Sequence, residues 1–140
     1  MEDDRIIEQQ ELENGITLIL FDRSRVTAGD RWLVELKCEA HIQTEDGFWN
    51  MVAEEDSKLQ ADIRKILGDR LVFETVNKRN FIDASEREIV LQEMVQQFYS
   101  TILEYLKRPH FPQEFFKKQY REARKKILLE QAIKRNADTC

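Results

Sequence analysis

The chain has 140 residues, a length typical of one compact domain. Hydrophobic residues make up 41% and charged residues 35%, with only 4 glycines and 2 prolines, which excludes collagen-like and glycine-rich disordered classes. The net charge of −5 argues against a general nucleic-acid binder, because such proteins neutralise phosphates with a positive surface. We therefore expect a single domain over residues 1–140, with its own core and long solvated helix faces.

Cysteines and apolar runs indicate the compartment. Cys38 lies in an apolar run and Cys140 is far from it, so the pair is a poor disulfide framework, and no CxxC motif is present. Residues 1–5 are acidic where a secretory signal is basic, and no run approaches the ~18 apolar residues of a membrane span. We expect a cytoplasmic protein without a membrane span.

The first third of the chain predicts a meander of three antiparallel strands. Residues 5–13 lead into Asn14 and Gly15, which favour the positive φ angles of a two-residue hairpin turn, and residues 16–21 form the second strand. After a turn at residues 28–30, apolar and mostly polar residues alternate along residues 31–43. The apolar set is Trp32, Val34, Leu36, Cys38, Ala40 and Ile42. A period of two over this length predicts one buried face and one solvated face.

The middle of the chain is mixed. Residues 44–53 give no clear pattern, whereas residues 56–67 have apolar positions on one helical face and Gly68 as a stop signal. Residues 71–76 predict a fourth strand that extends the sheet.

The last third is helical. A helix capped by Asp83 or Ser85 carries an apolar stripe of about five turns that ends near Leu106. Pro109 and Pro112 separate it from the last helix, in which Pro112 takes the first position. The predicted fold class is α+β, with an antiparallel sheet of about four strands packed by two long C-terminal helices.

The last helix is basic. Residues 107–135 hold ten bases against three acids, whereas residues 1–70 carry a charge of −8. The candidate binding residues are Lys117, Lys118, Arg121, Arg124, Lys125 and Lys126. They could bind the phosphates of a nucleic acid. We favour the interpretation that they form a solvated helix face, part of which pairs with acidic residues of the N-terminal half of the chain. The apolar stripe is too narrow for a membrane-surface helix, and no aromatic residues interleave with the bases.

Glu35, Glu39 and His41 share the polar face of the strand at residues 31–43, with alternate positions ~7 Å apart. Such a row could hold a divalent metal or support acid–base chemistry if Asp22 or Glu74 completed it. The ordinary interpretation, which we favour, is a solvated sheet face.

Five aromatic residues lie near the ends of predicted elements: Phe48, Trp49, Phe111, Phe115 and Phe116. They either close the core at the edge of the sheet or form a surface for a partner or a second copy of the chain.

Motifs of common catalytic sites are missing from the sequence. It contains no GxSxG, GxGxxG, P-loop or HExxH pattern, so we assign no catalytic residue, no metal and no cofactor. We favour a non-catalytic interaction or adaptor domain that forms a homodimer or binds a protein partner through its long helix and aromatic residues. The first alternative is a nucleic-acid-associated protein that binds through the basic helix. The second alternative is a small hydrolase or metal-dependent enzyme that uses the polar face of residues 31–43.

Overall fold

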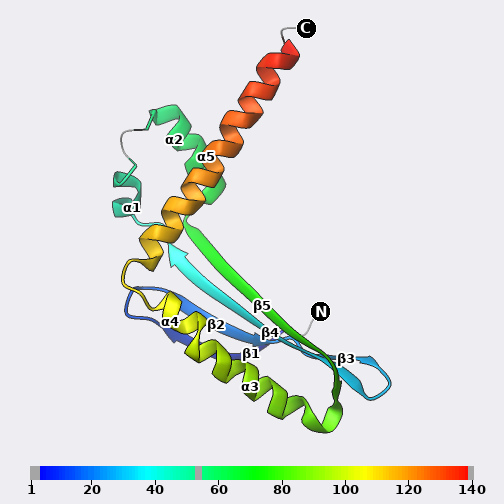
Figure 1. The fold of residues 1–140 in the computed structure, drawn as a ribbon. Helices are drawn as coiled ribbons and strands as arrows, with labels where there is room; N and C mark the ends of the chain where they lie inside the picture. Colours follow the sequence, from blue (N-terminus) through cyan, green and yellow to red (C-terminus); the bar gives the residue numbers. More distant parts are fainter. Residues whose placement is uncertain (1–3, 53–54, 139–140) are drawn as a thin grey trace. The chain divides into compact units, whose positions relative to one another are not determined.

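The computed structural model describes residues 4–52 and 55–138 and has the α+β architecture that the sequence predicts. Its elements are β1 (Arg5–Glu11), β2 (Thr17–Asp22), β3 (Arg25–Ala28), β4 (Arg31–Gln43), α1 (Asp46–Asn50), α2 (Ser57–Leu67), β5 (Arg70–Asp83), η1 (Ala84–Glu86), α3 (Arg87–Ser100), α4 (Ile102–Leu106) and α5 (Phe111–Asp138) (Figure 1).

The chain divides into two compact units. The first contains the residues up to Ile42 and Val72–Phe111, and the second contains Gln43–Leu71 and the residues from Pro112 onward. The first unit thus holds almost the whole sheet together with α3 and α4, and the second holds α1, α2 and nearly all of α5. That residues 1–140 fold as a single domain stays a prediction.

The hairpin of β1 and β2 forms where Asn14 and Gly15 predict it. Its turn is wider than two residues, since the Leu12 amide donates to the Ile16 carbonyl oxygen at 2.8 Å and Gly15 takes a φ of 93° inside the loop. The Asn14 side chain also donates to the carbonyl oxygen of Leu106 at 2.7 Å. The turn residue therefore ties the hairpin to the end of α4.

β4 is the central strand of the sheet. β2 pairs with its second half, where Phe21 lies opposite Lys37. β3, a short strand that the sequence did not predict, pairs with its first half, where Val26 lies opposite Trp32. The Arg23 amide donates to the Glu35 carbonyl oxygen between these two pairings, so β2 and β3 follow the same side of β4.

β5 pairs with the other side of β4 and is longer than the predicted residues 71–76. The Thr44 amide donates to the Asp69 carbonyl oxygen just before β5 begins. Where β5 ends, Asp83 lies 4.0 Å from Arg31 at the start of β4. The two strands are therefore antiparallel.

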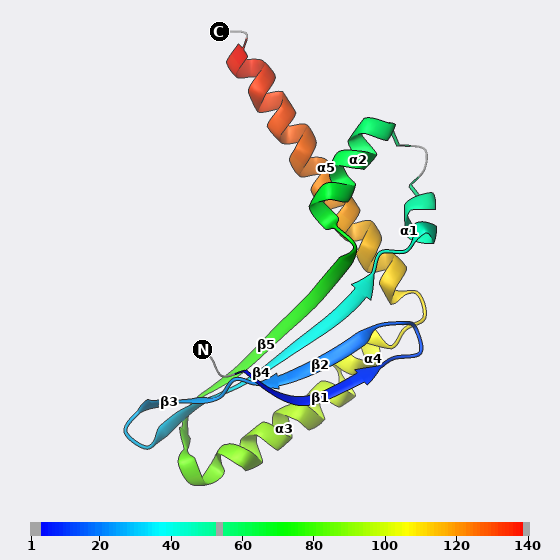
Figure 2. The same ribbon diagram turned by 180° about the vertical axis from the view of Figure 1, so that it is seen from behind.

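The helix α3 covers one face of this sheet (Figure 1 and Figure 2). Leu36 and Cys38, from the alternating apolar set of β4, line a cavity of about 250 Å³ together with Met94 and Phe98 of α3. That apolar set is buried except for Trp32, which is half-buried. The apolar set thus marks the covered face as predicted, whereas the other face is not the solvated one that was expected: Leu33 and Glu35 on it are buried, and the residues from Lys37 to His41 on it are half-buried.

The predicted five-turn helix is interrupted at Thr101. This residue has φ −124° and ψ −77°, outside the helical region, and it separates α3 from α4. The hydroxyl groups of Ser100 and Thr101 both donate to the Gln97 carbonyl oxygen, at 3.1 and 2.7 Å. Such side-chain bonds compete with the backbone ladder, which explains the break.

The second unit packs short helices against the first half of α5. α2 has the predicted extent, with Asp56 accepting a hydrogen bond from the Leu59 amide and Gly68 ending the helix at φ 70°. α1 occupies residues that gave no pattern in the sequence. α5 begins at Phe111, one residue before the predicted start, so Pro112 lies in its first turn. Amides of the first turn have no acceptor within the helix, so the missing N–H of proline costs no hydrogen bond there.

Candidate functional site

The helix α5 is buried over its first half only. Phe116, Tyr120 and Ala123 form its buried stripe, and Ala123 is the last buried residue in the part of α5 up to Ala137. Beyond Ala123, the side chains up to Ala137 are exposed apart from the half-buried Ile127 and Ala132. At 1.5 Å per residue, about 20 Å of helix follows the buried stripe without being covered. This exposed half of the helix is the candidate functional site.

Large apolar side chains lie on the exposed half. Leu129 and Ile133 are each 59% exposed and Leu128 is 36% exposed. The helical period of 3.6 residues places all three away from the buried stripe, so none of them extends the core of the second unit. Clustered exposed apolar side chains of this kind mark interaction sites.

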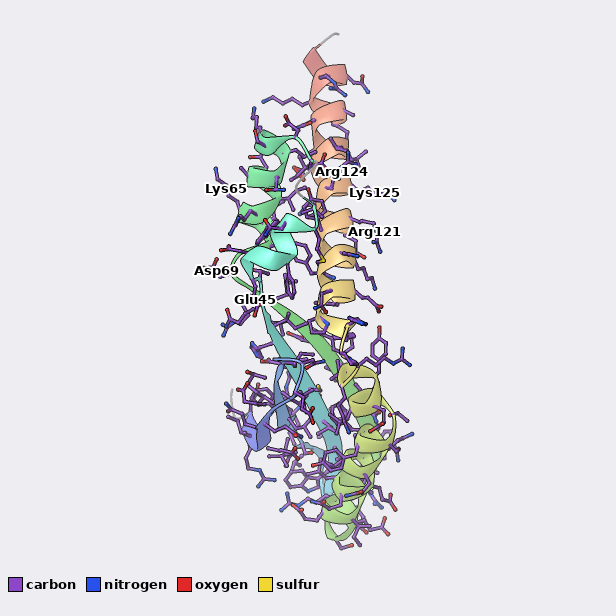
Figure 3. All side chains as sticks on the ribbon, turned by 90° about the vertical axis from the view of Figure 1, so that its left-hand side faces the viewer. Glu45, Lys65, Asp69, Arg121, Arg124 and Lys125 are labelled. Carbon is purple, nitrogen blue, oxygen red and sulfur yellow. The ribbon has the colours of Figure 1, made fainter. Side chains whose placement is uncertain are left out.

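Basic side chains surround these apolar residues. Arg121, Arg124, Lys125, Leu128 and Leu129 line a shallow hollow of about 540 Å³ on α5. Figure 3 shows Arg121 and Lys125 on the side of α5 that faces away from α2. We call Arg121, Lys125, Leu128, Leu129 and Ile133 the basic–apolar surface.

All six bases that the sequence proposed for binding are exposed: Lys117, Lys118, Arg121, Arg124, Lys125 and Lys126. At 3.6 residues per turn, five of them fall within an arc of about 120° on one side of α5, and Lys126 lies outside that arc. Arg121 and Lys125, four residues apart, line the hollow together with Leu128 and Leu129.

Arg124 is held by the second unit itself. Its guanidinium pairs with Glu55, which also accepts a hydrogen bond from the Tyr120 hydroxyl at 3.5 Å. The hydrogen bond to Glu55 raises the pKa of Arg124, and burial together with the Glu55 charge raises the pKa of Tyr120. Arg124 therefore has a structural partner.

The five aromatic residues proposed for an interface close the cores of the two units. In the second unit the Phe116 ring lies 5.3 Å from Phe48 and 4.9 Å from Trp49, centroid to centroid. In the first unit Phe111 packs edge-on against rings of β5 and α4. These four residues are buried and Phe115 is half-buried, so ring packing removes them from an exposed patch. Their packing corresponds to the first of the two alternatives, in which they close the core.

Glu35 differs from the solvated residue that the strand pattern predicts. It is 2% exposed, and its carboxylate lies 3.3 Å from the Arg23 guanidinium and 3.1 Å from that of Arg25. The strand alternation puts Glu39 and His41 on the same face, but Glu35 is occupied by its two arginines. The three residues are therefore not brought together as one site.

Of the two residues proposed to complete that site, Asp22 lies on the opposite face of the sheet, and Glu74 lies near Lys37. Asp22 lies opposite Leu36, on the covered face, and pairs with Arg5. Glu74 lies near enough to Lys37 to raise its pKa. Within residues 4–52 and 55–138, no group of three His, Cys, Asp or Glu side chains is arranged to hold a metal ion.

Lys37, Glu39 and His41 instead form a row of charge-assisted bonds. Glu39 lies 2.9 Å from Lys37 Nζ and 2.9 Å from His41 Nε2. Burial alone would raise the pKa of Glu39, but the bonds from Lys37 and His41 outweigh it and hold that pKa below its usual value. The bond to Glu39 raises the pKa of Lys37. The row stabilises the uncovered face of the sheet.

Sequence reasoning missed the exposed apolar residues of α5. The signal was present, because Leu128, Leu129 and Ile133 fall off the stripe that runs from Phe116 to Ile127.

Comparison with models of protein families, with curated protein sequences and with solved structures found no match. Among the helices of the described residues, none combines the length and the apolar character that crossing a lipid bilayer requires.

Proposed function

We propose that this chain is a non-catalytic interaction module of the cytoplasm that binds a protein partner through the basic–apolar surface of α5. The observation that carries the proposal is the 59% exposure of both Leu129 and Ile133 on a helix half that its own unit leaves uncovered. Two large apolar side chains one turn apart on an uncovered helix half would stabilise a complex in which a partner buries them.

The chemistry of the surface defines the partner. Leu129 and Ile133 are spaced as anchors for an amphipathic helix, which lays its own apolar face against such residues. Residues 121–138 hold six bases against three acids, so complementary charge requires an acidic segment. We therefore propose an acidic amphipathic helix of another protein as the partner.

The test uses a fluorescein-labelled synthetic amphipathic peptide built from leucine and glutamate. Fluorescence anisotropy with the full chain should show saturable binding, and the Leu129→Ala/Ile133→Ala double variant should bind roughly 10-fold or more weakly. Arg121→Glu/Lys125→Glu should also bind more weakly, because it reverses the complementary charge.

The matched control is Ile66→Ala, which removes a 51% exposed apolar side chain from α2 of the same unit. It should leave the peptide affinity unchanged. Equal affinity of the wild type and the Leu129→Ala/Ile133→Ala variant would overturn the proposal.

A nucleic-acid-associated role is the second candidate, because all six candidate bases are exposed. It predicts that a labelled duplex of about 20 base pairs binds with an affinity that falls steeply with salt. Duplex binding that survives Leu129→Ala/Ile133→Ala but is lost in Arg121→Glu/Lys125→Glu would favour this role. Absence of binding at ~50 mM salt would exclude it.

A further inference from the structure

The strand β5 forms an edge of the sheet in the first unit. β2 and β3 follow one side of β4 and β5 follows the other, and in the described part of the chain β4 is the strand that pairs with β5. Residues 76–81 are exposed at six consecutive positions, although alternate residues point to opposite faces. An edge strand of this length presents unpaired backbone groups that can pair with another strand.

The side chains on the uncovered face of β5 are arranged symmetrically. Strand alternation puts Val72, Glu74, Val76 and Lys78 on one face, and the packing of Phe73, of the alternate set, against Tyr105 and Phe111 identifies it as the uncovered face. Glu74 and Lys78 lie two residues on either side of Val76, which is 46% exposed. An acid and a base at equal distances from an apolar residue make the segment complementary to its own antiparallel copy.

We propose that two copies of this chain pair through β5 as antiparallel edge strands, with Val76 on the twofold axis. In this register Val76 lies opposite Val76 of the second copy, and Glu74 of each copy lies opposite Lys78 of the other. Directly opposed residues of an antiparallel pair have Cβ atoms ~5 Å apart, close enough for both ion pairs. A twofold axis gives an isologous interface, in which each contact occurs twice.

The backbone sets the extent of the paired segment. Phe81 has a φ of 59°, in the left-handed region that bulky residues rarely adopt, so the extended edge stops there. The proposed register pairs Val72 with Asn80 of the second copy, and the paired segment of residues 72–80 therefore ends just before Phe81. Nine residues at ~3.3 Å per residue give an interface ~30 Å long.

Charge complementarity selects a second copy as the occupant of this edge. The segment of residues 72–80 holds one acid and two bases, with Glu74 and Lys78 on the same face. The basic–apolar surface of α5 lacks this balance, since two copies would bring like charges together. The proposal goes beyond the partner binding proposed for α5 and uses residues of the other unit.

Reversing the charges of Glu74 and Lys78 tests the interface. Size-exclusion chromatography with light scattering should give a dimer for the wild-type chain at tens of micromolar. Glu74→Lys and Lys78→Glu should each weaken the dimer roughly 10-fold or more, because each creates two pairs of like charges. The Glu74→Lys/Lys78→Glu double variant should restore the dimer, and so should a mixture of the two single variants.

This design separates the interface from folding. A variant that merely unfolds would not be rescued by the second substitution, and Leu129→Ala/Ile133→Ala should leave the dimer intact even if the function proposed for α5 fails. A monomer for the wild type at 100 µM would overturn the proposal, as would a dimer that both single charge variants keep as tightly as the wild type.

Cysteine crosslinking tests the register. In a Cys140→Ser background, Val76→Cys should give a disulfide-linked dimer under mild oxidation, because the two thiols would meet at the twofold axis. Val72→Cys is the matched control and should crosslink at least 10-fold more slowly, since its opposite residue is Asn80. Equal crosslinking of both variants would overturn the register.

Discussion

The two halves of α5 share one helical period and lie in opposite environments. In the first half Phe116 is fully buried against the rings of Phe48 and Trp49. In the second half Leu129 is 59% exposed. Apolar residues at helical spacing thus specify a helix, whereas the neighbours that the fold supplies decide which of them enter a core. We propose that the uncovered ones bind a partner.

The largest expected effect comes from the buried half. Phe116→Ala should lower the free energy of unfolding by about 3–5 kcal/mol, because it removes a fully buried ring and leaves a cavity among the aromatic residues. Urea denaturation followed by circular dichroism measures the loss. A change below 1 kcal/mol would show that the buried half is not a packed core.

A buried charged residue extends the comparison. Glu35→Gln should lower the free energy of unfolding by about 2 kcal/mol. The buried carboxylate accepts charge-assisted bonds from Arg23 and Arg25, whose guanidinium groups stay partly hydrated. Its control on the exposed half of α5, Lys125→Gln, should change the free energy of unfolding by less than ~0.5 kcal/mol. Equal effects of the two substitutions in urea denaturation would contradict this account.

Glu39→Gln should lower the free energy of unfolding by about 1 kcal/mol at neutral pH and should leave it almost unchanged near pH 2. The folded-state pKa of Glu39 lies below its usual value, so its contribution is present above the unfolded-state pKa. It disappears as the pH falls through the folded-state pKa. Unfolding curves at several pH values measure the difference between variant and wild type, and a difference that persists unchanged at acid pH would contradict the proposed bonds.

The smallest effect is expected for the exposed apolar residues. Leu129→Ala should change the free energy of unfolding by less than ~0.5 kcal/mol, because the side chain is largely hydrated and alanine favours the helix. The same denaturation assay applies. A loss of 2 kcal/mol or more would show that Leu129 belongs to a core.

The sequence predicted those parts of the fold that depend on local periodicity. The buried apolar set of β4 and the helix that Gly68 ends are confirmed, and the last helix begins within one residue of the predicted Pro112. β3 was missed because its four residues, all exposed, have no alternation of buried and exposed positions. The break at Thr101 was missed because hydroxyl bonds to a carbonyl interrupt the helix without changing the apolar pattern.

The candidate site depended less on local pattern. Residue type and helical spacing showed that the bases of α5 are charged and surface-oriented. The burial of Glu35 depends on Arg23 and Arg25, which the β-sheet brings to it, and the exposure of Leu129 depends on where α1 and α2 stop covering α5. Both depend on tertiary contacts between residues that are distant in the sequence, so the pattern of neighbouring residues does not predict them.

Chemical-shift mapping of the ¹⁵N-labelled full chain with the acidic amphipathic peptide tests the central claim most directly. The account predicts that the largest shift changes fall on residues 121–133 of α5, while the amides of the sheet stay unperturbed. Changes that concentrate on the sheet or on the buried half of α5, or a spectrum that the peptide leaves unaltered, would contradict it.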